Sequence, residues 1–268
     1  MSQSTAPIFV GGCGRSGTTL IRVILDSHPH IACGPELRAG FAALRLWEEY
    51  NTTYTGALSE HLLTPGDINA MFARLITSLM DNYRKAQDKL RSAEKSPNNV
   101  FFFQHLHAIF PESPLIHVIR DGRDVVCSLL SMDWVDGRGQ PIEYTRDAGK
   151  AAEFWVSAIR AGRLALSHPT MKNRYREVRY EDIINDPEPT LKGLFEFIGE
   201  PWDPAVLEFH RKDRYLGRHS STDQVSKPIY KSAMARWQKD LSKADKDKVK
   251  QVAGETLIEL GYTKNNAW

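Results

Sequence analysis

The sequence is poor in cysteine, in long apolar runs and in excess charge, and each shortage excludes a class of protein. Its three cysteines, Cys13, Cys33 and Cys127, are too few and too widely spaced for a disulfide framework or for a zinc site built from cysteine pairs. Its apolar runs extend over only a few residues, whereas a helix that crosses a bilayer needs about 20. We therefore expect no membrane span and no disulfide scaffold.

Excess charge and a targeting segment are missing as well. The formal net charge of +2 over 268 residues is too close to neutral to indicate a nucleic acid as partner, although a balanced total can contain a local basic pocket. The first residues, MSQSTAPIFVGG, lack the basic and apolar parts of a secretory signal, so we expect a cytoplasmic protein. No repeat or linker divides the chain, and residues 1–268 are expected to form a single domain.

Short apolar segments alternate along the chain with stretches of helical periodicity. Strands are expected at 8–10, 115–119 and 175–180, and helices at 18–27, 36–50, 66–89, 124–131, 146–166, 189–198 and 233–260, with a loop at 51–64. In the helix at 146–166, the residues expected to face the core are Phe154, Trp155, Ile159 and Leu164. The alternation predicts an α/β protein with a three-layer α/β/α arrangement around a central parallel sheet.

The strongest local motif is the glycine-rich segment GCGRSGTT at 12–19, between the first expected strand and helix. In that position, backbone N–H groups and the amino terminus of the helix form a site for an anion. The glycine spacing matches a nucleotide-binding P-loop, but Thr18-Thr19 replaces the usual Lys-Ser/Thr pair and the cation Arg15 lies inside the loop. The motif therefore favours one phosphate-like group over a triphosphate with Mg²⁺. A turn that only lets strand and helix pack closely is the alternative.

Further segments follow this loop in a definite order. They are FVGG at 9–12, RSGTTL at 15–20, LDSHP at 25–29, GPE-x-R at 34–38, EKSP at 94–97, VIRDGR at 118–123 with Ser128, RYED at 179–182, STDQV-x-KP at 221–228 and RW at 236–237. With them the chain resembles the sulfotransferases that use PAPS (3′-phosphoadenosine 5′-phosphosulfate), and most of all the tyrosylprotein sulfotransferase branch. The resemblance covers residues 8 to about 238. It implies a P-loop-like sulfotransferase fold, with PAPS as donor and 3′,5′-ADP as product.

The resemblance also implies which residues bind the nucleotide. The 5′-phosphosulfate would be held by Gly14, Arg15, Ser16, Gly17, Thr18 and Thr19. The 3′-phosphate would be held by Arg120 and Ser128; independently, Arg120 follows an expected strand and Ser128 lies about two turns into the next helix. Further nucleotide contacts would come from Lys95, Tyr180, Ser221, Thr222, Gln224, Val225, Lys227 and Arg236.

Sulfuryl transfer to a hydroxyl needs a base for the O–H proton and cations for the negative charge of the moving group and of the leaving phosphate. The resemblance implies Glu36 as the base and Lys95 and Ser221 as charge-stabilising groups, with Arg15 also catalytic. Glu36 and Arg38 would face the acceptor. A phenol suits this chemistry because its pKa near 10 makes it far easier to deprotonate than an aliphatic alcohol. We therefore expect tyrosine of a peptide or protein, or a small phenol, as acceptor.

Two positions depart from the branch that the chain resembles. Met132 stands where another basic residue is common, so the 3′-phosphate would lack one cation unless Arg123 or Arg138 supplies it. Ala93 stands where the disulfide partner of Cys33 would be, so that disulfide cannot form. Together with the absence of a membrane anchor, these departures suggest a cytoplasmic, bacterial relative.

Other functions remain open at this level. A small-molecule or carbohydrate hydroxyl could be the acceptor, and residues 39–90 would decide this by their shape. A small-molecule kinase could use the same loop with Mg²⁺, and a nucleotide-binding module without catalysis is a third alternative. Family members often dimerise, so a homodimer is also expected as one option. No metal is expected, because the histidines lack the spacing of a metal site: His28, His105, His107 and His117.

Overall fold

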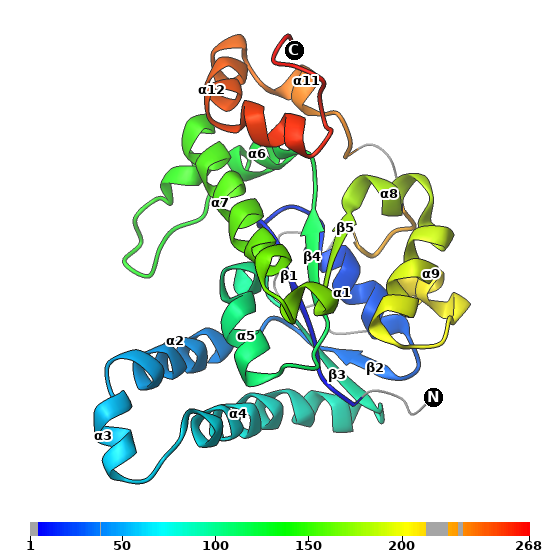
Figure 1. The fold of residues 1–268 in the computed structure, drawn as a ribbon. Helices are drawn as coiled ribbons and strands as arrows, with labels where there is room; N and C mark the ends of the chain where they lie inside the picture. The colour runs from blue at the N-terminus through cyan, green and yellow to red at the C-terminus, as the bar shows by residue number, and fades with distance from the viewer. Residues whose placement is uncertain (1–4, 38, 213–224, 230–232) are drawn as a thin grey trace.

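The computed structural model describes residues 5–37, 39–212, 225–229 and 233–268, and its centre is a five-stranded parallel sheet (Figure 1). The strands are β1 (Ile8–Gly11), β2 (Ile31–Cys33), β3 (Arg91–Lys95), β4 (Leu115–Ile119) and β5 (Tyr175–Arg179), in the spatial order β2-β3-β1-β4-β5. Every strand pair is parallel. The predicted α/β class and the central parallel sheet are thereby confirmed.

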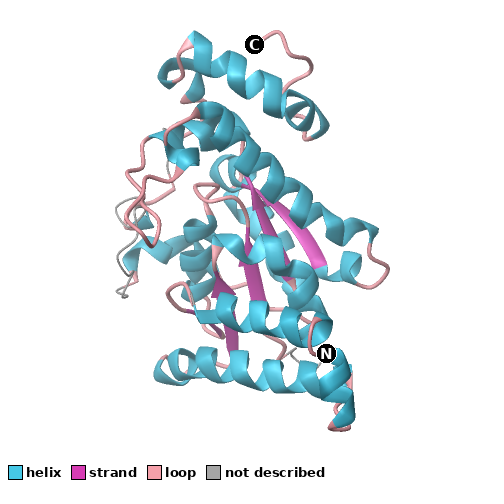
Figure 2. Ribbon diagram, turned by 90° about the vertical axis from the view of Figure 1, so that its left-hand side faces the viewer, coloured by secondary structure: helices cyan, strands magenta, loops and turns pink. Residues whose placement is uncertain are grey.

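Helices connect the strands and cover both sides of the sheet (Figure 2). The α-helices are α1 (Thr18–Ser27), α2 (Ala39–Thr52), α3 (Thr55–Glu60), α4 (Pro65–Ala86), α5 (Phe103–Ile109), α6 (Gly122–Leu130), α7 (Ala148–Ser167), α8 (Tyr180–Asn185), α9 (Pro187–Ile198), α11 (Trp237–Asp240) and α12 (Lys243–Glu259). Short 3₁₀ helices are η1 (Pro97–Phe102), η2 (Glu143–Thr145), η3 (Met171–Arg174) and η4 (Pro204–Arg211).

The sheet separates two hydrophobic cores. Successive strand residues point to opposite faces, so Phe9 packs into the core formed with α5, α6, α7 and α12, whereas Ile8 and Val10 pack into the core formed with α1, α8 and α9. Because helices cover both faces, β1 and β4 are buried along their whole length and mostly apolar, as in most parallel sheets, whereas β3 is equally buried but mostly polar. We call the two sides the α7 face and the α1 face.

The order of the strands also determines where a ligand can bind. β1 lies between β3 and β4, so the chain turns to opposite sides of the sheet after β1 and after β3. Parallel α/β sheets bind ligands in the crevice beyond the carboxyl ends of the strands at such a point. The segments that follow β1, β3 and β4 are the glycine-rich loop, Ser96-Pro97 and Arg120-Asp121, and they meet at this edge.

Several sequence-based predictions need correction. β2 and β3 were not predicted, and the expected loop at 51–64 contains the helix α3. The helix expected from residue 36 begins at Ala39, so Glu36 lies in the preceding segment. On α7, Trp155 and Ile159 are buried as expected, but the Leu164 residue is 50% exposed because α7 is covered on only part of its circumference.

His117 in β4 is a histidine in the interior of the protein. Its Nδ1 lies 2.7 Å from the hydroxyl of Tyr175, and Gly162 of α7 leaves room for the ring, since a Cβ there would lie 2.3 Å from Nδ1. Complete burial lowers the pKa of His117 from 6.5 to about 4. The predicted hydrogen-bonding role of this histidine fits the contact with Tyr175.

The titration of His117 predicts a pH-dependent stability. Between pH 6.5 and about 4 the unfolded chain binds a proton at this ring that the native state does not bind. The free energy of unfolding should therefore fall as the pH is lowered through this interval, by up to about 3 kcal/mol. We expect urea unfolding of His117→Gln to depend less on pH than that of the wild type or of His61→Gln, which changes an exposed histidine. Equal pH slopes for the three proteins would contradict this prediction.

Candidate active site

The glycine-rich loop joins β1 to α1 and leaves the amino terminus of this helix open. Gly17 caps α1 with a left-handed backbone (φ 97°), and no side chain caps the helix, so its first N–H groups are not taken up by a capping side chain. A Cβ on Gly17 would lie 2.5 Å from the ring of Tyr180, so only glycine fits here. The loop can therefore offer several N–H donors and the positive end of the helix dipole to one anion.

Two arginines and a serine meet beside the loop. Arg15 Nε donates to Ser128 Oγ at 3.0 Å, Arg120 Nη1 donates to the carbonyl of Arg15 at 3.0 Å, and the Arg120 guanidinium lies 4.8 Å from the centre of the Tyr180 ring. Buried polar atoms normally have hydrogen-bond partners, yet the buried Ser16 Oγ and Arg120 Nε have none among the described residues. An anion with several oxygens would fit these donors.

An ion pair lies at the opposite side of the loop. Lys95 ends β3 with its side chain fully buried, and its Nζ lies 2.6 Å from Glu36 Oε1 and 3.5 Å from Thr19 Oγ1. Glu36 is 59 residues away in sequence and comes from the segment after β2. The Lys95 ammonium group thus links the Glu36 carboxylate to the glycine-rich loop.

Glu94, which the sequence analysis included in the EKSP motif without a role, supports this ion pair through its hydrogen bonds. Its carboxylate accepts hydrogen bonds from Leu37 N (3.1 Å), from Ser96 Oγ (2.6 Å) and from the side-chain amide of Asn99. Burial raises the pKa of Glu94, while these hydrogen bonds oppose that rise. Because Leu37 follows Glu36 directly, Glu94 positions the backbone that carries the Glu36 carboxylate. The motif indicated this position, but the role depends on contacts with Leu37 and Asn99 that the sequence does not show.

Asp124 is a second supporting residue that the sequence analysis missed. Its carboxylate accepts hydrogen bonds from Ala235 N at 2.7 Å and Trp237 N at 3.0 Å, and it lies 3.9 Å from Arg120 Nη2. Burial raises the pKa of Asp124. Asp124 therefore holds both Arg120 and the segment that contains Arg236 at the site.

These groups surround a cavity of about 700 Å³ at the carboxyl edge of the sheet. Most predicted site residues line it: Gly14, Arg15, Gly17, Thr18, Thr19, Glu36, Arg120, Ser128, Tyr180, Val225, Lys227 and Arg236. Ser16 and Lys95 are buried directly behind its wall. Four predicted site residues lie outside the described residues: Arg38, Ser221, Thr222 and Gln224.

Neither arginine considered as a substitute for the cation missing at Met132 lines the cavity. Arg123 is bound to Asp121 at 2.7 Å and lies 4.1 Å from the ring centre of Trp237, and Arg138 is exposed on the hairpin at 133–142. Phe154, which we expected in the core, is only partly buried and does line the cavity. The structure therefore corrects the interpretation of Phe154 as a core residue only.

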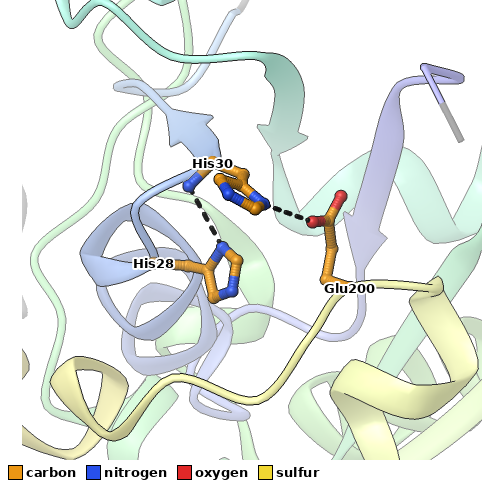
Figure 3. Close-up of side chains that lie close together, drawn as sticks. All are labelled: His28, His30 and Glu200. Atoms are coloured by element: carbon orange, nitrogen blue, oxygen red, sulfur yellow. Dashed lines mark hydrogen bonds and ion pairs between the residues drawn. The ribbon is translucent and has the colours of Figure 1, made fainter. Parts of the chain in front are cut away.

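His28, His30 and Glu200 form a separate cluster whose side chains are of the types that bind metal ions (Figure 3). The ring of His28 already accepts the N–H of His30 at Nδ1 (3.2 Å) and lies 2.9 Å from the carbonyl of Pro201 at Nε2; His30 Nδ1 lies 3.1 Å from Glu200 Oε2. A metal ion would have to displace these contacts. We assign the cluster the structural role of joining the end of α1 to the turn after α9.

Comparisons with known proteins identify the family. A model of the sulfotransferase family matches residues 7–204. The chain belongs to the sulfotransferase family. Protein-tyrosine sulfotransferase A of Caenorhabditis elegans is 31% identical over 97% of this chain and 68% of its own length. Protein-tyrosine sulfotransferase of Drosophila melanogaster (29%; 95% and 51%) and human protein-tyrosine sulfotransferase 1 (28%; 95% and 69%) are also similar. This sulfotransferase thus spans between about half and about seven-tenths of the length of these relatives.

Solved structures agree on the fold. The sulfotransferase domain of the Synechococcus PCC 7002 olefin synthase superposes with a TM-score of 0.63 at 24% identity, covering 95% of each chain. The sulfotransferase domain of the curacin biosynthetic pathway gives a TM-score of 0.61 at 21% identity, covering 95% of this chain and 98% of that one. The predicted family, enzyme class and sulfotransferase fold are confirmed. Within the described part of the chain, no helix is long and apolar enough to cross a membrane.

The close approach of Tyr180 to Gly17 gives a test of the loop geometry. Gly17→Ala forces a side chain into a left-handed backbone, which costs about 1–2 kcal/mol, and also displaces the Tyr180 ring, which costs about 1–3 kcal/mol more. Gly199→Ala is the matched control, because Gly199 is also left-handed (φ 73°) but has open space around its Cβ position. Urea unfolding should show a clearly larger loss for Gly17→Ala; equal losses would contradict the close contact.

Proposed function

We propose that this sulfotransferase transfers the sulfuryl group of PAPS to a phenolic hydroxyl and releases 3′,5′-ADP. The observation that carries the proposal is the arrangement at Lys95, whose ammonium group contacts both the Glu36 carboxylate and the Thr19 hydroxyl of the phosphate loop. A base for an acceptor and a cation for a leaving phosphate are thus within one hydrogen bond of each other. Sulfuryl transfer needs both of these groups at one reacting centre.

The donor is supported by the distribution of cations and donors around the cavity. PAPS carries anionic groups at two ends, and the cavity offers two places for an anion: the open end of α1 with Arg15 and Ser16, and the neighbouring pair of Arg120 and Ser128. We propose that the 5′-phosphosulfate binds the first and the 3′-phosphate the second. Lys227 and Arg236 line the same cavity and would add positive charge.

The transfer itself can be written with these residues. The Glu36 carboxylate accepts the proton of the acceptor hydroxyl as its oxygen bonds to sulfur, and the bond from sulfur to the bridging phosphate oxygen breaks. Lys95 and the N–H groups of the loop stabilise the charge on the departing phosphate. Arg15 would stabilise charge on the sulfuryl group. Ser221 and Arg38 keep the roles implied by the resemblance, as proposals.

The expected acceptor is tyrosine of a peptide or protein. Support comes from the names of the relatives, which are protein-tyrosine sulfotransferases at 28–31% identity. A phenol also matches a carboxylate base, because its proton is far more acidic than that of an aliphatic alcohol. The homodimer, the cytoplasmic location, the bacterial origin and the single-domain organisation stay predictions.

If Glu36 is the base, its replacement should slow sulfuryl transfer without weakening nucleotide binding. Glu36→Gln should leave the affinity for 3′,5′-ADP nearly unchanged while transfer from PAPS falls by at least roughly 100-fold, the usual contribution of a general base. Glu48→Gln, at an exposed position of α2, is the control. Calorimetry measures binding, and mass spectrometry with tyrosine peptides, phenols and sugars measures the addition of a sulfuryl group. Normal turnover of Glu36→Gln would remove the residue from this role.

The assignment of Arg120 to the 3′-phosphate predicts a selective loss of affinity. Because hydrogen bonds to charged groups contribute about 1.5–3 kcal/mol, Arg120→Ala should weaken 3′,5′-ADP at least about tenfold and 5′-AMP much less. Arg138→Ala should change neither, since Arg138 lies on the exposed hairpin. Equal losses for both nucleotides would place the 3′-phosphate elsewhere, and a loss in Arg138→Ala would assign it to the hairpin.

A further inference from the structure

The turn after β4, which carries Arg120, is held by side chains from other parts of the chain. The Arg120 carbonyl accepts the indole N–H of Trp155 at 3.1 Å, and the Asp121 N–H donates to Glu181 Oε1 at 2.9 Å. Both polar groups of the peptide between Arg120 and Asp121 are therefore fixed. The Asp121 carboxylate in turn accepts hydrogen bonds from Nε and Nη2 of Arg123, at 3.0 and 2.7 Å.

Residues 260–268, which follow α12, reach this turn beside α6 (Figure 1). The Tyr262 hydroxyl donates to Glu181 Oε2 at 3.0 Å, and the Tyr262 carbonyl accepts a hydrogen bond from Arg123 Nη2 at 3.0 Å. The Tyr262 ring also lies 4.9 Å from the guanidinium of Arg179 at the end of β5. Tyr262 is thus bound to both of the side chains that hold Asp121.

Arg123 also packs against two indole rings. Its guanidinium lies 4.1 Å from the ring centre of Trp237 and 4.9 Å from that of Trp268, and the two rings meet edge to face at 5.3 Å. A cation over the face of a tryptophan is attracted by the electrons of the ring. The buried Trp268 Nε1 has no hydrogen-bond partner among the described residues. Within this part of the chain, packing of the ring therefore holds Trp268 in place.

The segment of Trp237 leads back to the guanidinium of Arg120. The Trp237 N–H donates to Asp124 Oδ1 at 3.0 Å, and the other carboxylate oxygen of Asp124 lies 3.9 Å from Arg120 Nη2. The carbonyl of Ala233, in the same segment, accepts a hydrogen bond from Arg120 Nη2. Arg123 is therefore connected to Arg120 by two routes, through the turn after β4 and through the segment at 233–237.

These supporting residues are separate from the surface that a ligand would meet. Among the described residues, those that line the cavity include Arg120 and Ser128 but not Arg123, Tyr262 or Trp268. A guanidinium binds phosphate through N–H groups that point in fixed directions, so a small rotation weakens the contact. A change at the supporting residues would thus reach a bound phosphate through the orientation of Arg120.

On the basis of the proposed function, in which Arg120 binds the 3′-phosphate, we propose that Arg123, Tyr262 and Trp268 are positioning residues for the nucleotide. They hold the turn after β4 and the segment at 233–237, so that the Arg120 guanidinium is oriented before the 3′-phosphate arrives. Arg123 acts through Asp121 and Trp237 and does not replace the cation missing at Met132. Selectivity for a 3′-phosphate therefore depends on residues 260–268.

Trp268→Ala tests the proposal, because it removes one indole from Arg123 and leaves the described cavity lining unchanged. In calorimetry, we expect the Kd of 3′,5′-ADP to rise at least about fivefold and that of 5′-AMP less than about twofold. Trp268→Phe, which keeps an aromatic face, should recover most of the affinity. Trp202→Ala is the matched control: Trp202 also contacts a cation, Lys192 at 5.5 Å, but it follows α9 and is not among the residues that line the cavity.

Kinetics separate positioning from a general loss of structure. In Trp268→Ala, KM for PAPS should rise at least about fivefold while kcat with a tyrosine peptide stays within about twofold, since the Lys95–Glu36 pair belongs to other strand ends. Tyr262→Phe removes the hydroxyl that binds Glu181 and should shift the nucleotide affinities in the same selective way. Tyr54→Phe, at an exposed tyrosine, should not.

The nucleotide affinities also distinguish failure of this inference from failure of the proposed function. If Arg120→Ala shows its selective loss, equal losses for both nucleotides in Trp268→Ala, or no loss in Trp268→Ala and Tyr262→Phe, would overturn this inference alone. Tyr262→Phe, which removes a single oxygen, decides the question should Trp268→Ala not fold. Without a selective loss in Arg120→Ala, the proposed place of the 3′-phosphate is wrong and this inference is overturned with it.

Discussion

The buried ion pair between Lys95 and Glu36 is the interaction on which the site depends. A fully buried ammonium is costly unless it is paired and hydrogen-bonded, and such pairs contribute little net stability. The pair lies where we propose the chemistry, and hydrogen bonds from neighbouring residues hold its two members in position. Glu94 anchors the backbone of Leu37, and Asn99 connects Glu94 to the carbonyl of Val10 at the end of β1. The carboxyl ends of β1, β2 and β3 are thereby connected to the Lys95–Glu36 ion pair.

The sheet also explains why two different hydrophobic cores contribute to the walls of one cavity. Each face of the sheet has its own core, and each core extends past the strand ends to form one wall of the cavity. Tyr180 and Val225 of the α1-face core line the cavity, as do Phe41, Trp134 and Phe154, which pack against the α7-face core. On the basis of the proposed function, a cavity bounded by both cores holds the nucleotide and the acceptor together.

The sequence predicted the structure best where neighbouring residues form both the secondary structure and the proposed binding site. β1, the glycine-rich loop and α1 follow directly from an apolar strand, glycines and helical spacing. β3 was missed because its residues are mostly polar, and their burial depends on distant partners such as Glu200 for Arg91. The same limit applies to the site. Motifs indicated Glu36 and Lys95 separately, but their contact, the support from Glu94 and the position of Trp134 in the cavity wall arise only when β2, β3 and the hairpin at 133–142 come together.

The unusual phosphate loop has a physical explanation in this arrangement. A nucleotide P-loop carries its lysine directly after the last glycine, where this chain has Thr18. Here a lysine reaches the same region from the neighbouring strand, with Lys95 Nζ 3.5 Å from Thr19 Oγ1. A lysine within the loop would extend along the phosphates, whereas one at the end of β3 also contacts the carboxylate that follows β2. In the proposed function, the position of the cation on β3 therefore lets a single ammonium group contact both the leaving oxygen and the base.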